Sequence, residues 1–321
     1  MEQRTLGKTG IKVSPIGLGC MGMSHAYGDP KDKDEMIKLI RHAFEIGCTF
    51  FDTAPVYGFD NEKILGEAVK PFRSQVIIGT KFGITGQKVV DGTPVNILDS
   101  RPETILKDVD ASLERLQTDY IDLYYQHRID PNVEPEVVAN VMKQLIESGK
   151  IRAWGVSNAP IDYIRRAHKV CPIAAMQNQY SLIFRSPEKE YIPLCEELGI
   201  TFVAYGPVGS GFLSGRFTKD STYEKSDFRS TMKRFRDQAM DTNGKVLDVI
   251  KELAKAKNCT TAQIALAWAL AQKPFIVPIP GTTNINRLEE NMGSLKIAFT
   301  KEEMDNLNEA LSHLEIDESY F

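Results

Sequence analysis

The chain has 321 residues, of which 42% are apolar and 26% are charged. These fractions are typical of a folded globular protein and exclude a disordered or fibrous chain. The length fits either two domains or one large α/β barrel. The net charge is −4, whereas nucleic-acid-binding proteins usually carry a basic excess, so we expect no nucleic-acid partner.

Three further patterns bear on location and metal binding. No apolar run approaches the roughly 18 residues that a membrane-spanning helix needs, and the first residues lack the apolar segment of a secretory signal. The five cysteines are odd in number and form no C-x-x-C pair, which is typical of reduced thiols. The five histidines lack metal-binding spacings such as H-E-x-x-H. We therefore expect a cytoplasmic protein with no membrane partner and no metal site.

The first predicted element is a short β-hairpin, in which residues 4–6 and 11–13 flank a glycine-bounded turn. Short strand-like runs then alternate with amphipathic helical patterns. Eight runs are expected to be strands: residues 16–19, 49–52, 76–80, 121–125, 153–156, 175–178, 201–204 and 275–278. The helices expected between them include residues 33–46, 103–116, 134–148, 188–198 and 245–257.

This alternation predicts an α/β fold, because parallel strands need crossover connections that are usually helical. Eight such units predict a (β/α)8 TIM barrel. The alternative is an open doubly wound sheet, whose first strand leads through a glycine-rich turn into a helix. Here the glycine-rich residues 17–22 lead into the loop-like stretch 23–30. Because no Pro/Gly/Ser-rich linker divides the chain, we expect residues 1–321 to form one barrel domain.

A long connection follows the seventh expected strand. Nearly forty residues between Tyr205 and Asn243 carry few helix or strand signals, and loops of that length are usually functional. Between Gly206 and Met240, seven cationic residues face four anionic ones, in a chain whose overall charge is negative. This excess is compatible with a phosphate-bearing ligand and also with a solvated surface loop.

Four residues of matched chemistry lie at the ends of neighbouring expected strands, where a barrel places its reactive groups. Asp52, Lys81 and His127 close the second, third and fourth strands, and Tyr57 lies one short loop after Asp52. A phenol keeps its proton at neutral pH, a nearby ammonium would lower its pKa, and a carboxylate would hold that ammonium in place. An imidazole can hydrogen-bond a carbonyl oxygen. Each residue alone has an ordinary structural explanation. Together they suit protonation of a carbonyl oxygen while a nicotinamide supplies hydride.

Six segments, in this order, resemble the aldo-keto reductase family along nearly the whole chain. They are residues 17–22, 51–58, 79–81, 120–128, 155–158, and 281–283 followed by 287–291. The segments Gly-Cys-Met-Gly-Met-Ser and Tyr-Gln-His-Arg resemble those of a branch that includes pyridoxal reductases and perakine reductase. The resemblance implies NADPH-dependent reduction of aldehydes or ketones to alcohols. It implies Tyr57 as the acid, Asp52 and Lys81 as the residues that tune it, and His127 as the residue that orients the carbonyl.

The resemblance also implies a cofactor site. Ser157, Asn158 and Gln179 would meet the nicotinamide carboxamide, Tyr205 would stack on its ring, and Arg287 would contact the 2′-phosphate. The full implied set is Met21, Asp52, Ser157, Asn158, Gln179, Tyr205, Gly206, Pro207, Val208, Gly209, Ser210, Gly211, Arg216, Gly281, Thr282, Thr283, Arg287, Glu290 and Asn291. In this set residues 206–215 would wrap the pyrophosphate, with Arg216 beside it, and Glu290 and Asn291 would contact the adenine.

The chain departs from many relatives within this set. Gly206, Val208 and Ser210 stand where those relatives have Ser, Leu and Arg, and Gly281 stands where some carry a Lys. These departures bear on the preference for NADPH and leave the four catalytic candidates intact.

A small carbonyl compound is the expected partner. The residues expected around it are Met23, His25, Tyr27, Tyr57, Phe82, His127 and Trp154. Two other functions stay open at this point. One is an NADPH-binding regulatory subunit with vestigial activity, since potassium-channel β subunits share the family. The other is a different barrel enzyme, such as a sugar-phosphate isomerase, which would leave residues 287–291 unexplained.

Overall fold

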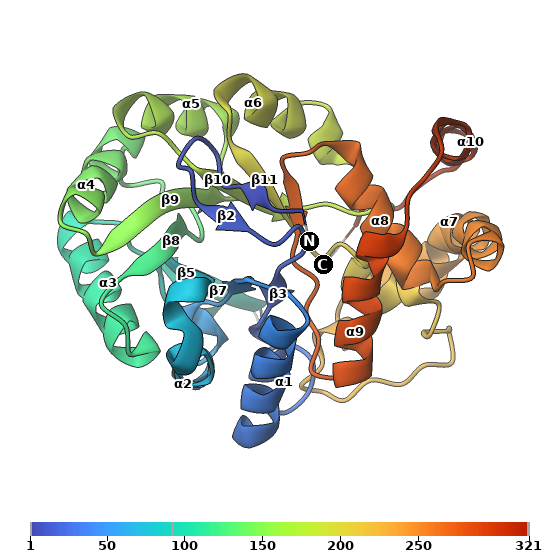
Figure 1. The fold of residues 1–321 in the computed structure, drawn as a ribbon, viewed down its shortest axis with the longest axis horizontal. Helices are drawn as coiled ribbons and strands as arrows, with labels where there is room; N and C mark the ends of the chain where they lie inside the picture. Colours follow the sequence, from blue (N-terminus) through green and yellow to red (C-terminus); the bar gives the residue numbers. More distant parts are fainter. Residues whose placement is uncertain (1, 91–92, 320–321) are drawn as a thin grey trace.

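The computed structural model describes residues 2–90 and 93–319, and its centre is a sheet of eight parallel strands (Figure 1). The strands follow one another in chain order around the sheet: β3 (Leu18–Gly19), β4 (Phe50–Asp52), β5 (Ile77–Phe82), β8 (Ile121–Gln126), β9 (Ile151–Ser157), β10 (Ala175–Gln179), β11 (Thr201–Tyr205) and β12 (Ile276–Pro278). The first and last strands also meet, because the Gly17 N–H donates to the Pro278 carbonyl at 3.0 Å and the Gly19 N–H to the Pro280 carbonyl at 3.2 Å. The predicted (β/α)8 barrel is therefore confirmed.

The predicted N-terminal hairpin, β1 (Arg4–Thr5) and β2 (Lys12–Val13), covers one end of this barrel. Leu6 and Val13 are fully buried and pack with side chains of the barrel interior. The Thr201 hydroxyl, at the start of β11, donates to the Thr5 carbonyl at 3.0 Å. The hairpin thus closes the end where the strands begin, and the opposite end forms the mouth.

Helices surround the barrel on the outside (Figure 1). They are α1 (Lys33–Glu45), α2 (Phe59–Val69), α3 (Pro102–Leu116), α4 (Pro135–Glu147), α5 (Ile161–Val170), α6 (Tyr191–Leu198), α7 (Asp237–Ala256), α8 (Thr261–Gln272), α9 (Ile285–Gly293) and α10 (Lys301–Ser312). Side-chain caps fix several helix starts. Thr260 and Gln263 form a capping box at α8, and Asp32 accepts a bond from the Glu35 N–H at α1. No helix in the described ranges is long and apolar enough to cross a membrane.

Two expected helix starts differ from the structure by three residues or more. Helix α7 begins at Asp237, eight residues before the expected start at 245, because Ala239, Met240 and Asn243 are buried. Tertiary packing there outweighs the poor helix propensity of the Thr-Asn-Gly sequence. Helix α6 begins at Tyr191 and not at 188, since the 3₁₀ turn η4 (Ser186–Glu188) precedes it.

Each barrel strand separates two layers of core. In β8, Leu123 and Tyr125 point into the barrel, while Tyr124 packs in the layer between sheet and helices. The same alternation places Lys81 inside the barrel and its neighbours Thr80 and Phe82 outside it. Strand parity therefore decides which side chains can reach the mouth.

Loops after the strands build the mouth. The long connection after β11 runs through residues 206–236 and contains the 3₁₀ turns η5 (Gly209–Ser214), η6 (Phe228–Ser230) and η7 (Lys233–Phe235). It reaches the loop after β3, where the Phe228 N–H donates to the Ala26 carbonyl at 2.8 Å. The expected long loop is thus confirmed, although it ends earlier than expected.

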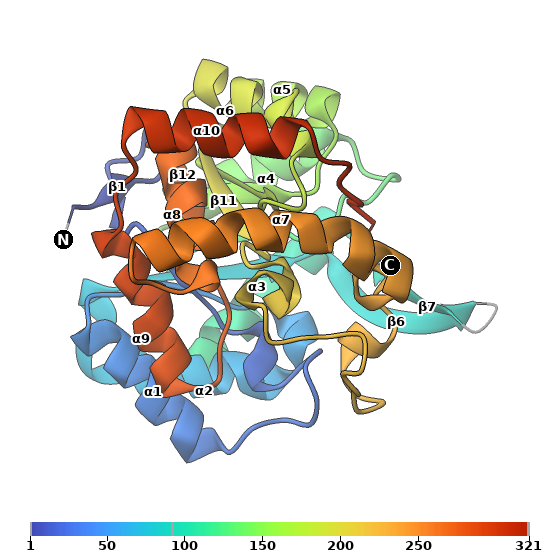
Figure 2. The ribbon, with the colours of Figure 1, turned by 90° about the vertical axis from the view of Figure 1, so that its right-hand side faces the viewer.

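A second hairpin, β6 (Ile84–Val90) and β7 (Thr93–Leu98), follows β5 and projects from the body of the molecule (Figure 2). Sequence analysis did not predict it. Most described side chains of β6 are exposed, so the strand lacks the alternation of buried and exposed residues that identifies a half-buried strand.

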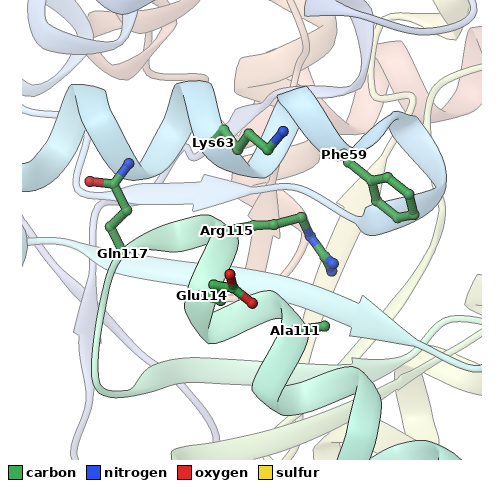
Figure 3. Close-up of a pocket in the computed structure, with 6 residues that line it drawn as sticks. All are labelled: Phe59, Lys63, Ala111, Glu114, Arg115 and Gln117. Atoms are coloured by element: carbon green, nitrogen blue, oxygen red, sulfur yellow. The ribbon is translucent and has the colours of Figure 1, made fainter.

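A shallow pocket of about 390 Å³ lies outside the barrel, between α2 and α3 (Figure 3). It is lined by Phe59, Lys63, Ala111, Glu114, Arg115 and Gln117. The four catalytic candidates are absent from this lining, so the pocket is separate from the mouth.

The close packing of α2 on α3 yields a test of the fold. Alanine at Gly66 would place its Cβ against the backbone carbonyl of Leu116, which cannot move without shifting α3. We expect Gly66→Ala to lower the free energy of unfolding by about 1–3 kcal/mol. Gly244→Ala, also within a helix, meets no atom within 4 Å and should raise it by about 0.5–1 kcal/mol. Urea unfolding followed by circular dichroism measures both, and equal effects of the two substitutions would contradict this packing.

Candidate active site

Lys81 joins three of the four catalytic candidates inside the barrel mouth. Its ammonium donates to Asp52 Oδ1 at 2.5 Å, to the Thr53 carbonyl at 2.9 Å and to the Tyr57 hydroxyl at 3.2 Å. Asp52 ends β4, Lys81 lies in the neighbouring strand β5, and Tyr57 ends the 3₁₀ turn η2 (Pro55–Tyr57). The parallel register of β4 and β5 brings these groups together.

His127 completes the group from the end of β8. Its ring lies edge-on to the Tyr57 ring, with centroids 5.9 Å apart and planes at 87°. The His127 N–H donates to the Phe82 carbonyl at 2.9 Å, which fixes the backbone beside β5. The structure thus brings together all four residues singled out from the sequence.

A buried network holds the backbone of Tyr57. The Ser24 hydroxyl donates to the Tyr57 carbonyl at 2.8 Å. Asn61, 1% exposed, donates to Ser24 Oγ at 2.6 Å and to the Cys20 carbonyl at 3.0 Å, and it accepts from Thr53 Oγ1 at 2.6 Å. Because Asn61 uses both donors and its acceptor, this contact between the first two loops of the mouth is fully satisfied.

Burial sets the protonation of the phenol. It raises the pKa of Tyr57 above the ordinary value, and the neighbouring Lys81 ammonium only partly opposes it. The ammonium lowers this pKa, as expected, but burial raises it by more, so the pKa of Tyr57 is raised overall. Burial also works against the charge of Lys81, yet the charges and hydrogen bonds of Asp52 and Tyr57 together outweigh it, and the pKa of Lys81 is raised. A protonated phenol therefore lies beside a charged ammonium.

The imidazole of His127 is kept neutral. Burial lowers the pKa of His127 well below its ordinary value, and the positive charges of Lys81 and Arg128 lower it further. A neutral imidazole carries one N–H donor and one acceptor nitrogen. It can therefore hydrogen-bond a carbonyl oxygen without bringing a second full charge to Tyr57.

One residue of this site was missed from the sequence. Gln177, in β10, donates from Nε2 to Asp52 Oδ2 at 2.7 Å and is 3% exposed. It lies opposite Ser157 in the register of β9 and β10. The signal was present, because Gln177 lies two residues before Gln179 in a strand and therefore shares its face of the sheet.

The residues expected at a nicotinamide lie together at the ends of β9, β10 and β11. Asn158 donates from Nδ2 to Ser157 Oγ at 2.9 Å and accepts from the Tyr205 hydroxyl at 3.2 Å. With its amide oxygen turned toward the guanidinium, Gln179 accepts from Arg234 Nη2 at 2.7 Å. Arg234, a fully buried residue of the long loop, was also missed from the sequence.

The start of the long loop turns sharply where a pyrophosphate was expected. Gly206, Gly209, Ser210 and Gly211 all have positive φ, between 58° and 97°. This conformation favours glycine and, with Pro207 and Val208 between them, makes a tight turn after β11. Successive backbone N–H groups in such turns form sites suited to anions.

Three arginines gather near α9. Burial lowers the pKa of Arg287, and the charges of Arg216 and Arg229 add to this effect. Arg216 donates to Glu290 Oε2 at 2.9 Å. Two residues expected to contact different parts of a cofactor therefore pair with each other in this structure.

The other residues expected around a cofactor lie nearby. Gly281 forms a parallel bridge with Gly19 at the barrel seam, Thr282 Oγ1 accepts from the Asn284 N–H at 3.2 Å, and Asn291 is 9% exposed in α9. Met21 begins the 3₁₀ turn η1 (Met21–Met23), and Thr283 precedes α9.

The expected substrate residues divide into two groups. His25 stacks beside Tyr57, with ring centroids 6.1 Å apart, and the Tyr27 ring faces the Arg229 guanidinium at 5.2 Å. These two side chains lie at the mouth, and their contact with a substrate stays a prediction.

Phe82 and Trp154 do not belong to the mouth. Phe82 packs on Tyr124 in the layer between sheet and helices, and Trp154 donates from its indole to the Cys171 carbonyl at 3.2 Å. Their strand neighbours face inward, so parity turns these two side chains away from the barrel interior, and the expectation for them was wrong. Met23 is 1% exposed and packs in the same outer layer.

Comparisons with known proteins agree with this architecture. Residues 15–312 match the Aldo/keto reductase family. The chain is 42% identical over 308 residues to "Probable aldo-keto reductase 1" of Glycine max, covering 95% of this chain and 88% of that protein.

Two solved structures share the fold. The glycerol dehydrogenase of Gluconobacter oxydans has a TM-score of 0.88 at 27% identity, covering 99% of this chain and 98% of that one. An aldo/keto reductase of Klebsiella pneumoniae, solved with NADP and acetate, has a TM-score of 0.74 at 24% identity, covering 99% of this chain and all of that one. The match over residues 15–312 and the 42% identity place the chain in the aldo/keto reductase family, a family of NAD(P)-dependent oxidoreductases that act on small carbonyl compounds.

Proposed function

We propose that the protein is an NADPH-dependent reductase that converts aldehydes or ketones to alcohols. The observation that carries this proposal is the contact of the Lys81 ammonium with both Asp52 and the Tyr57 hydroxyl, with the His127 ring beside them. This arrangement offers a proton at Tyr57 and a means of holding the charge that remains once the proton has left.

The proton moves from the Tyr57 hydroxyl to the carbonyl oxygen of the substrate. Burial keeps the phenol protonated at neutral pH because it raises the pKa of Tyr57. The Lys81 ammonium, 3.2 Å away, stabilises the phenolate that the transfer leaves. Asp52 keeps that ammonium charged and in place. Neutral His127 hydrogen-bonds the substrate oxygen and orients it toward the phenol.

The residues at the mouth suit a nicotinamide dinucleotide phosphate. The cluster of Arg216, Arg229 and Arg287, in which burial and the charges of the other two lower the pKa of Arg287, favours a polyanionic ligand. The turn at residues 206–211 offers backbone N–H groups to phosphate oxygens. Ser157, Asn158 and Gln179 would hold the carboxamide, and Arg287 the 2′-phosphate. When bound, NADPH supplies the hydride that the side chains of the chain cannot supply.

We also infer one barrel domain acting in the cytoplasm. Both ends of the described chain are tied to the barrel, since the N-terminal hairpin covers its closed end and Asp317 exchanges hydrogen bonds with Asn243. The five cysteines are free thiols, which is typical of a reducing compartment.

The proposed acid is tested by Tyr57→Phe, which removes the hydroxyl and keeps the ring. We expect kcat for reduction of 4-nitrobenzaldehyde to fall about 100-fold or more, while the dissociation constant of NADPH changes less than about twofold. Loss of NADPH absorbance and fluorescence titration measure the two quantities. Tyr163→Phe, which removes a buried hydroxyl bonded to Gln126 instead, should leave kcat within about threefold of the parent value. Near-normal turnover by Tyr57→Phe would show that another group supplies the proton.

The proposed 2′-phosphate contact is tested by Arg287→Ala. Loss of a charge-assisted contact costs about 1.5–3 kcal/mol, so the dissociation constant of NADPH should rise about 10- to 150-fold. NADH lacks the 2′-phosphate, and its dissociation constant should change less than about threefold. The matched control is Arg165→Ala, since Arg165 pairs with Glu197 on the outer surface. An equal rise of the dissociation constants of NADPH and NADH would contradict the contact between Arg287 and the 2′-phosphate.

The neutral state of His127 predicts the pH dependence. A histidine whose pKa lies well below 6.5 stays uncharged as the pH falls from 8 to 6. We therefore expect kcat/KM for 4-nitrobenzaldehyde to show no acid limb near pH 6.5, because kcat/KM reports groups of the free enzyme. A limb near pH 6.5 that disappears in His127→Gln would mean that His127 titrates in its ordinary range.

A further inference from the structure

Arg128 is a cation of the mouth that the proposed mechanism does not use. It directly follows His127 at the end of β8 and is half-buried. Its Nη1 donates to the His127 carbonyl at 2.8 Å. Within residues 2–90 and 93–319, no carboxylate forms an ion pair with it, and no other residue accepts a hydrogen bond from its side chain.

Four other arginines in loops of the mouth have acidic partners. Arg101 pairs with Asp99 at 2.7 Å. Carboxylates likewise pair with Arg185, Arg216 and Arg229. The half-buried guanidinium of Arg128, which has no carboxylate partner, differs in this from these four arginines.

The acid closest to Arg128 in the sequence has other partners. Asp130 is buried, and its Oδ2 accepts from the Ser100 N–H at 3.0 Å. Its Oδ1 accepts from the N–H and the side-chain amide of Asn132, at 2.9 and 3.0 Å. The loop thus uses both oxygens of its own carboxylate for backbone and amide donors and leaves the guanidinium without a counter-ion.

The Arg128 charge acts at the reaction centre. Burial raises the pKa of Tyr57 and lowers that of His127; the Arg128 charge partly opposes the first effect and adds to the second. The His127 ring, one residue away in the chain, lies edge-on to Tyr57. Because Arg128 Nη1 is bonded to the His127 carbonyl, the guanidinium lies beside a residue that would contact the carbonyl oxygen.

We propose that Arg128 binds an anionic group of the substrate, so that the preferred substrates are aldehydes or ketones that carry a carboxylate or a phosphate. A guanidinium offers a planar pair of donors that matches either anion. Such a ligand would supply the missing counter-ion of Arg128 and would place its own carbonyl group near the acid. This inference rests on the proposed function, because it names the substrate class of the same site.

The test uses two matched substrate arms and the ratio of kcat/KM within each arm. The carboxylate arm compares 4-carboxybenzaldehyde with its methyl ester, and the phosphate arm compares pyridoxal 5′-phosphate with pyridoxal. In at least one arm, the parent enzyme should prefer the anionic member about tenfold or more. Arg128→Gln should abolish that preference, mainly through KM, because it lowers kcat/KM for the anionic member about tenfold more than kcat/KM for the neutral member. Arg128→Lys should keep part of the preference.

Two controls separate binding of an anion from other roles of Arg128. Arg101→Gln removes an arginine of the same end of the barrel that already has a partner, and it should leave both ratios unchanged. If Arg128 only tuned Tyr57, Arg128→Gln would change neutral and anionic substrates equally, and the ratio would stay constant. A constant ratio, or a parent enzyme with no preference in either arm, would overturn the inference.

A binding measurement makes the inference independent of turnover. Calorimetric titration with benzoate and with inorganic phosphate should detect binding of at least one of them by the parent protein and loss of that binding in Arg128→Gln. A parent protein that reduces none of the four carbonyl compounds but binds the anion through Arg128 would contradict the proposed function alone. Equal anion binding by parent and variant would contradict the role of Arg128 alone.

Discussion

The buried ion pair between Lys81 and Asp52 is the constraint on which the mouth of the barrel depends. Two charges removed from water lower stability unless their remaining donors and acceptors are satisfied. Lys81 meets this condition through Thr53 and Tyr57, and Asp52 meets it through Gln177. These contacts join β4, β5 and β10 with the turn that carries Tyr57, so the pair is satisfied only when the barrel is closed in its native register.

Charged residues at the two ends of the barrel differ in whether the chain supplies their partners. Near the closed end, Asp122 accepts from Arg73 at 2.7 Å, from Arg152 at 2.6 Å and from the Ile78 N–H at 3.0 Å. Both of its oxygens are matched by the chain itself, as expected of a group that stabilises the fold. At the mouth, Arg128 lacks a carboxylate partner among the described residues. The charge of Asp122 is thus balanced by arginines of the chain, whereas that of Arg128 is not balanced by a carboxylate. This difference fits a barrel that binds its ligands at the carboxyl ends of its strands.

The sequence predicted the barrel because its eight strands and their helices differ in hydrophobic period, and it placed the four catalytic candidates because each ends a strand or follows one closely. It did not predict which way side chains near those ends point. Phe82 and Trp154 looked like pocket residues by type, but each alternates with an inward-facing neighbour. Gln177 was missed for the converse reason, since its inward position follows from that of Gln179. The pairing of Arg216 with Glu290 joins residues 74 positions apart, and no local pattern signals such a contact.

The charges around Tyr57 explain how this phenol can donate a proton although it is buried. The charges of Lys81 and Asp52 cancel, and His127 and the Tyr57 phenol are neutral, so these four groups together carry no net charge. Burial then holds the proton on the phenol, and the negative charge created by its departure falls 3.2 Å from an ammonium already in place. Arg128 adds the unbalanced positive charge at this centre. A substrate that brings its own anion would restore neutrality there, and a neutral substrate would leave the guanidinium half-buried and uncompensated.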